Sequence, residues 1–241
     1  MGTLCAIEAS GAASAQAVDA AFAVLNRVER CMHPTRDDSD LTRLRNARTD
    51  ETITIDPWTS EVLTLARKIH DLSGGLFDPC LPTRAGKLAD IDLLSHQQVR
   101  CRLNVDIDLG GIAKGYAVDR AIDALQRAGC SRGLVNAGGD LRVFGAEPHS
   151  VLVRRGDDHD DPQPISLTNM ALAVSNFDAT HPPSEHQGYY VRVAERFAIR
   201  RFAAIQAREA AVADALTKCA FFCTDEELQV LLTALDANIV A

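Results

Sequence analysis

The chain has 241 residues and a mass of 26.0 kDa, enough for one large domain or two small ones with a substantial core. Apolar residues make up 46% and charged residues 24%, which excludes a wholly disordered chain, and the apolar runs are too short to cross a membrane. The formal net charge of −8 argues against a general nucleic-acid-binding protein.

Capping residues and apolar spacing predict the elements of the first hundred residues. Ser14, Ser39 and Asp56-Pro57 stand where helices are expected to begin, and Gly74-Gly75 stands where the third helix ends. The expected elements, in chain order, are a strand at 3–9, helices at 14–28 and 39–44, a strand at 52–55 and a helix at 56–69. Residues 76–104 give mixed signals.

The remaining chain alternates strands and helices without a regular βαβ rhythm. We expect strands at 104–109, 133–136, 141–144, 151–153 and 165–174, and helices at 113–128, 207–222 and 224–235. Thr224 and Glu227 form a capping box for the last helix. The sequence therefore predicts an α+β fold of mixed sheets and helices rather than a doubly wound parallel sheet. We expect one domain over 1–241, with two α+β halves that could meet near 105–150.

Seven cysteines are spread along the chain without a CxxC pair, which predicts reduced thiols rather than a disulfide framework or a zinc ribbon. The sequence does not open with a basic segment, an apolar segment and a small-residue cleavage site. We therefore expect a cytoplasmic protein, or a periplasmic or membrane-anchored one if this sequence is part of a longer chain.

The segment 106–145 carries the strongest signal for chemistry. Gly110 and Gly111 permit a sharp turn and a close approach to a ligand, the next helix points its first amides at that turn, and Lys114 adds a cation. A diphosphate fits this combination, although the spacing matches neither a P-loop nor a GxGxxG pattern. The alternatives are a packing role for the glycines, a solvated first-turn lysine and, at 137–140, an ordinary hairpin turn.

Asp214 is the second candidate because it lies within the apolar helical run 213–222. A buried carboxylate is costly unless a cation or hydrogen bonds compensate it. Bound Mg²⁺ would do so, but the spacing favours an ion pair with Lys218, four residues further along the helix.

Leu76-Phe77-Asp78 is the third candidate. Phe77 could pack under a ring and Asp78 could accept hydrogen bonds from that ring, while a buried Phe beside a turn-forming Asp-Pro is the commoner arrangement.

Taken together and in order, six segments resemble the ApbE family of FAD:protein FMN transferases. They cover nearly the whole chain, and the fourth is the most specific. They are MGT at 1–3, DDSDLTRL at 37–44, GGLFDP at 74–79, DLGGIAKGYAVDRA at 108–121, NAGGD at 136–140 and ADALTK at 213–218.

The resemblance implies a mixed α+β fold that binds FAD and, with Mg²⁺, moves FMN onto a Thr or Ser of a target flavoprotein; some relatives hydrolyse FAD instead. Its implied FAD contacts are Met1, Leu76, Phe77, Asp78, Asp108 and Lys114. Its implied metal ligands are the backbone carbonyl of Gly111, the Asp214 carboxylate and the backbone oxygen of Thr217. No nucleic acid and no transmembrane segment are expected.

Three departures from the family pattern bear on this function. Lys218 stands where the family usually has a metal-binding Thr, and an ammonium repels Mg²⁺ rather than binding it. Thr35 replaces a usual Tyr, and residues 175–190 contain no recognisable HxIxDPxxG segment. Two hypotheses follow: a working flavin transferase, or an FAD-binding or partner-binding protein without transfer activity, in which Lys218 replaces the metal.

Overall fold

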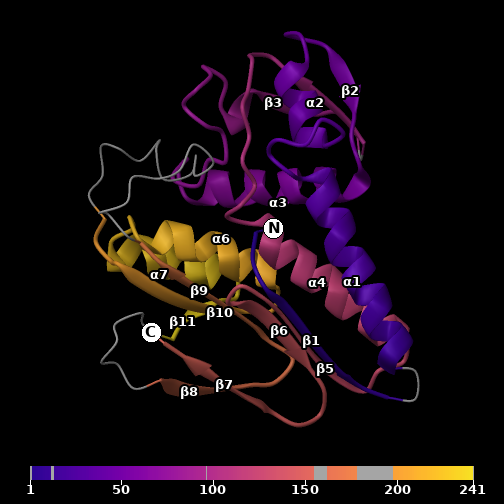
Figure 1. Ribbon diagram of the computed structural model, residues 1–241. Coiled ribbons are helices and arrows are strands. Elements are labelled where there is room, and N and C mark those ends of the chain that lie inside the picture. The colour runs from indigo at the N-terminus through magenta and orange to yellow at the C-terminus, as the bar shows by residue number, and fades with distance from the viewer. Residues whose placement is uncertain (1, 12–13, 96, 155–161, 178–197, 241) are drawn as a thin grey trace.

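The computed structural model describes residues 2–11, 14–95, 97–154, 162–177 and 198–240. Its centre is a six-stranded antiparallel sheet in the order β1-β5-β6-β9-β10-β11 (Figure 1). The strands of this sheet are β1 (Cys5–Ser10), β5 (Arg132–Ala137), β6 (Asp140–Phe144), β9 (Ala171–Asn176), β10 (Phe202–Ala207) and β11 (Asn238–Ile239).

Helices cover one face of this sheet and a β-hairpin covers the other (Figure 1). Along β9, Ala171 and Ala173 join the core under the helices, whereas Leu172 joins a second cluster under the hairpin, as the period of two in a strand requires. The helices are α1 (Ser14–Cys31), α4 (Ala113–Arg127), α6 (Ala210–Ala220) and α7 (Asp225–Ala234), and the hairpin strands are β7 (His149–Val153) and β8 (Gln163–Leu167).

A smaller three-stranded sheet, in the order β2-β4-β3, lies beyond α3 in the upper part of Figure 1. One apolar cluster nevertheless runs from this part to the main sheet, since it contains Leu63 and Val99 together with Ile205 and Leu216. The elements of the upper part are α2 (Asp40–Asn46), β2 (Thr52–Thr54), α3 (Pro57–Leu72), a 3₁₀ turn (Leu88–Asp90), β3 (Ile91–Leu93) and β4 (Gln98–Cys101).

The α+β fold predicted from the sequence is confirmed, and so are its local capping signals. The Ser39 side chain accepts a hydrogen bond from the amide of Thr42, and the Asp56 side chain accepts one from Trp58. Thr224 and Glu227 form the predicted capping box at the start of α7. These signals are reliable because they satisfy amides that the first helical turn leaves without partners.

Two predicted strands are wrong, and strand β10 was not predicted. Residues 104–109 form no strand, only a bridge between Ile107 and Cys80, because the backbone there pairs with the loop around Leu81. The region 165–174 contains two strands, β8 and β9, rather than one. The helix predicted at 207–222 is present as α6 (Ala210–Ala220), but residue 207 ends strand β10. The alanine-rich run of β10 is largely buried, so periodicity cannot separate it from a buried helix.

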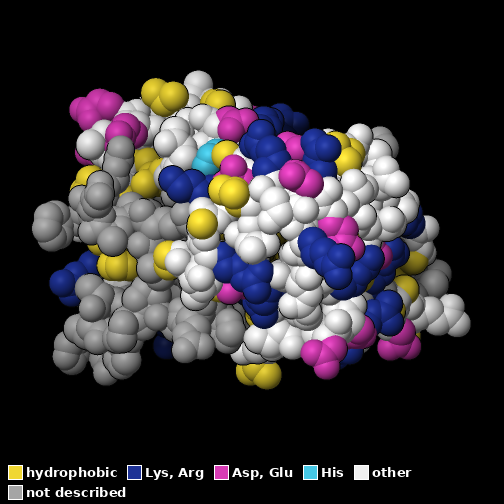
Figure 2. All heavy atoms as spheres, turned by 90° about the horizontal axis from the view of Figure 1, so that it is seen from above, with side chains coloured by type: hydrophobic (Ala, Val, Ile, Leu, Met, Phe, Trp, Pro, Cys, Tyr) yellow, Lys and Arg dark blue, Asp and Glu magenta, His cyan; other side chains and the backbone are white. Residues whose placement is uncertain are grey.

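Charges of both signs lie side by side on one face of the molecule. Figure 2, a view from above Figure 1, shows Lys and Arg next to Asp and Glu across that face rather than one field of a single sign. Ion pairs such as Arg100–Asp92, at 2.9 Å, contribute to this pattern. Among the described residues, no helix combines the length and apolarity that a membrane span requires.

Candidate functional site

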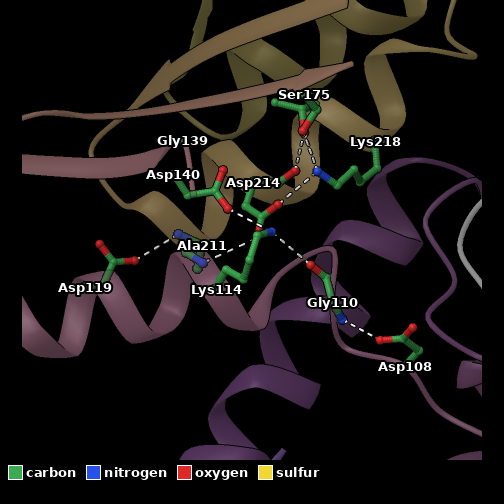
Figure 3. Close-up of polar contacts among 12 residues, drawn as sticks. Asp108, Gly110, Lys114, Asp119, Gly139, Asp140, Ser175, Ala211, Asp214 and Lys218 are labelled. Carbon is green, nitrogen blue, oxygen red and sulfur yellow. Dashed lines mark hydrogen bonds and ion pairs between the residues drawn. The ribbon is translucent and has the colours of Figure 1, made fainter. Parts of the chain in front are cut away.

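The turn before α4 holds its shape through side chain to backbone hydrogen bonds. The Oδ1 atom of Asp108 accepts a hydrogen bond from the Gly110 amide at 2.8 Å, which closes a tight turn of the kind that Asp favours. The Gly110 carbonyl in turn accepts one from the Lys114 ammonium at 3.1 Å. Lys114 therefore folds back toward the glycine turn that precedes its own helix (Figure 3).

Lys114 joins two carboxylates that are far apart in the sequence. Its Nζ atom lies 2.9 Å from Oδ2 of Asp140 and 3.4 Å from Oδ2 of Asp214. Asp140 is the first residue of β6, directly after the Gly138-Gly139 turn, and Asp214 lies in the second turn of α6 with a side chain that is 0% exposed. Lys114 is therefore not the solvated first-turn lysine of the alternative interpretation.

Lys218 holds the other side of Asp214. Its Nζ atom lies 3.1 Å from Oδ1 of Asp214, 2.6 Å from Oγ of Ser175 and 3.0 Å from Oγ1 of Thr217 (Figure 3). The ion pair predicted from the i,i+4 spacing is confirmed, but its side chains are 8% and 0% exposed, so it is a buried pair. Each oxygen of Asp214 thus faces the ammonium of a different lysine.

Burial and charge set the protonation of this cluster. Burial raises the pKa of Asp140, as does the charge of Asp214, and Lys114 offsets only part of this, which leaves that pKa at about 6. Burial also disfavours the charged form of Asp214, but Lys114 and Lys218 outweigh it and lower the pKa of this carboxyl. Burial lowers the pKa of Lys114. The carboxylates of Asp214 and Asp140 raise it by a larger amount, so the pKa of Lys114 lies above its usual value.

Close packing of α4 on α6 brings the cluster together. A Cβ atom on Gly115 would lie 2.2 Å from the carbonyl oxygen of Ala210, so only glycine allows the two helices this approach. The Gly115 amide also donates to Oδ2 of Asp214 at 3.3 Å. Asp119, one turn further along α4, accepts hydrogen bonds from the amides of Ala210 and Ala211, both at 2.9 Å.

Two of the predicted flavin contacts serve the surrounding structure. Phe77 is 1% exposed and belongs to the main apolar core. One oxygen of Asp78, itself 3% exposed, accepts hydrogen bonds from the amides of Cys80 and Leu88. Leu76 packs partly buried against the same core. These contacts match the commoner arrangement considered for this segment, and the predicted flavin contacts of all three residues stay predictions.

Some of the other predicted features fall outside the described residues. Met1 is outside them, as are residues 178–190 of the segment 175–190. Gly111 is buried at the turn before α4, and the Thr217 hydroxyl donates to the carbonyl of Asp214 at 2.7 Å.

The sequence reasoning missed Asp140, Ser175 and Asp119 as members of this site. Asp140 had a signal, since it is a carboxylate that opens a strand directly after a Gly-Gly turn. Asp119 also had one, because it falls on the buried face of α4 together with Gly115 and Ile122. Ser175, at the end of an apolar strand, had none.

The residues around Asp214 do not fit a Mg²⁺ ion as they lie. Mg²⁺ requires oxygen ligands, whereas both oxygens of Asp214 face ammonium groups that can only donate. Within the part of the chain that the structure describes, no group of three or more His, Cys, Asp or Glu side chains could hold a metal ion. A divalent cation would have to displace Lys114 or Lys218 to reach this carboxylate.

Comparison with known proteins decides the family. The family model described as "ApbE family" matches residues 1–241. The chain belongs to the ApbE family. Among curated ApbE-like relatives, a protein of Rhodobacter capsulatus named FAD:protein FMN transferase is 28% identical over 81% of this chain and 42% of its own length. One of Treponema pallidum with the same name is 25% identical over 60% of this chain and 50% of its own. The chain thus spans about half the length of these curated relatives.

Solved ApbE structures share the fold. The flavin transferase ApbE of Vibrio cholerae superimposes with a TM-score of 0.81 at 18% identity, over 99% of this chain and 89% of that one. The ApbE protein of Thermotoga maritima gives 0.77 at 23% identity, over 99% and 91%. At these identities the superpositions support the fold alone.

Proposed function

We propose that this protein binds FAD and transfers its FMN half to a Thr or Ser hydroxyl of a target flavoprotein. Membership of the ApbE family supports this class of reaction, as do the two relatives named FAD:protein FMN transferase. The observation that carries the proposal is the glycine turn at 110–111, with Lys114 folded over it beside two carboxylates. An FAD diphosphate placed at this turn would find a fixed cation.

The proposed transfer exchanges one phosphorus–oxygen bond for another. The acceptor hydroxyl oxygen bonds to the FMN phosphorus, and the bond from that phosphorus to the bridging oxygen breaks. AMP leaves with the bridging oxygen, and the hydroxyl proton passes to solvent. Negative charge develops on the leaving phosphate, where the Lys114 ammonium stabilises it. Asp140 and Asp214 hold that ammonium in place. Met1, Leu76, Phe77, Asp78 and Asp108 complete the proposed FAD contacts.

The Mg²⁺ dependence that the resemblance implies finds no support in the arrangement of Asp214 and Lys218, and no step is assigned to a metal. A second function, FAD binding without transfer, is favoured by the same observation. Lys114 and Lys218 already direct their donors at protein oxygens, which leaves less positive charge for a leaving phosphate.

Incubation of the purified protein with FAD and a Thr-containing peptide from a flavoprotein separates these functions. Transfer yields AMP and a peptide heavier by FMN less water, in equal amounts, as measured by chromatography and mass spectrometry. Hydrolysis yields AMP and free FMN, and a binding protein leaves FAD intact but bound. Absence of both binding and turnover would contradict the proposal.

A further inference from the structure

The Lys218 ammonium occupies a pocket of oxygen atoms at the centre of the site. Among the described residues, its contacts at hydrogen-bonding distance are one carboxylate and two hydroxyls, from Asp214, Ser175 and Thr217. An ammonium has three donors and no acceptor, so these three oxygens match its donors in number. Carboxylate and hydroxyl oxygens are also the ligands that a hard divalent cation takes.

The hydroxyl protons around Lys218 have one consistent arrangement. The Thr217 hydroxyl donates to the carbonyl of Asp214, and its oxygen lies 2.9 Å from that of Ser175. Since Lys218 can only donate, Ser175 accepts from Lys218 and gives its own proton to Thr217. Each of the three oxygens that a metal would need on this side of Asp214 therefore already faces a donor.

The charges of the four ionisable residues in the cluster balance. Two carboxylates, Asp140 and Asp214, face two ammonium groups, Lys114 and Lys218, so their sum is zero when all four are charged. Without Lys218 the sum would be −1, which repels a diphosphate and attracts a cation. Adding Mg²⁺ to the intact cluster would leave two uncompensated positive charges beside buried groups, which is costly.

The chain uses lysine sparingly, and two of its lysines are here. It contains 21 Arg and 4 Lys, so arginine is the ordinary cation of this protein. Arginine is a planar fork, whereas lysine is a compact point charge with three donors. The compact ammonium matches a pocket made by three converging oxygens.

We propose that Lys218 is a built-in replacement for a divalent cation: its ammonium neutralises Asp214, so the site takes its anionic ligand without Mg²⁺. The identity of the anionic ligand rests on the proposed binding of FAD, whereas the inference about the cation pocket does not depend on it. The two parts can therefore be tested separately.

The first experiment measures the melting temperature against MgCl₂ concentration without FAD. Wild type is expected to show no saturable shift. Lys218→Thr, which opens the pocket and leaves hydroxyl and carboxylate oxygens in it, is expected to melt lower and to regain stability as Mg²⁺ saturates it. Adding Asp214→Asn to Lys218→Thr should abolish that gain. Lys68→Thr, at an exposed position of α3, is the control for loss of a lysine and should behave as wild type.

A saturable shift in wild type that Asp214→Asn removes would overturn the inference, as would a folded Lys218→Thr protein that gains no response to Mg²⁺. If Lys218→Thr does not fold, the wild-type titrations decide.

The second experiment titrates wild type with FAD in EDTA and in MgCl₂. Dissociation constants that agree within about twofold support the inference, and an affinity at least about tenfold higher with Mg²⁺ overturns it. No FAD binding under either condition would contradict the proposed function instead, and the first experiment would still decide the cation pocket.

Discussion

Gly115→Ala tests whether close packing of α4 on α6 builds the site. In a solvated helix this change stabilises by about 1 kcal/mol, because alanine has the higher helix propensity. Here the new Cβ would lie 2.2 Å from the Ala210 carbonyl oxygen, while ordinary contact begins at 3.4 Å, so the helices must separate by 3.4 − 2.2 = 1.2 Å. The obstructing atoms are backbone, which cannot rotate away.

Overpacking of this kind costs about 1–3 kcal/mol or more, and the separation would also stretch the 3.4 Å contact between Lys114 and Asp214 toward the limit for an ion pair. We expect a net loss of about 2 kcal/mol in the free energy of unfolding, measured by urea denaturation with circular dichroism. Ala124→Gly, later on the same helix, is the matched control and should lose up to about 1 kcal/mol, which shows the ordinary preference for alanine. A Gly115→Ala protein as stable as wild type, or more so, would refute the packing argument.

The remaining predictions concern the carboxylates. Asp119→Asn should lower the free energy of unfolding by about 2–4 kcal/mol, because it weakens two buried amide contacts and the 2.8 Å ion pair with Arg142. Asp123→Asn, at the half-exposed pair with Arg120, should lower it by under about 1 kcal/mol in the same urea assay. Equal costs would show that Asp119 does not join α4 to α6. In the folded protein the pKa of Asp140 is about 6, because burial and the charge of Asp214 outweigh the charges of Lys114 and Lys218. This pKa lies above the ordinary value of 3.8, so the contribution of Asp140 to stability falls as pH rises from about 4 to about 6. The stability of wild type relative to Asp140→Asn, from melting curves at several pH values, should therefore decline across that window, and an increase would contradict the assigned direction.

Local signals in the sequence predicted a large part of this fold. Ser39, Asp56 and Thr224 cap helices as expected because a cap acts within one turn of the chain. The Gly138-Gly139 turn likewise joins the predicted pair of strands β5 and β6, since both glycines adopt positive φ. The strand β10 was missed because burial on both faces erases the alternation that marks a strand.

The candidate site likewise combines residues that local patterns single out with contacts that only the packing of distant elements creates. Lys114 and Asp214 could each be singled out from its neighbours, and the pair of Asp214 with Lys218 follows from spacing within one helix. The contact between Lys114 and Asp214 joins residues 100 positions apart, and it depends on how α4 crosses α6. Ser175 enters the cluster only because β9 ends beside α6, which no local pattern encodes.

The most direct test of the account is the affinity of the protein for FAD with and without the Lys114 charge. Titration of wild type, Lys114→Met and the exposed control Lys68→Met with FAD, followed by quenching of flavin fluorescence, gives the three dissociation constants. The account predicts binding by wild type and Lys68→Met, and a loss of at least about tenfold in Lys114→Met, since a charge-assisted contact to phosphate is removed. Equal affinity in all three proteins would contradict it.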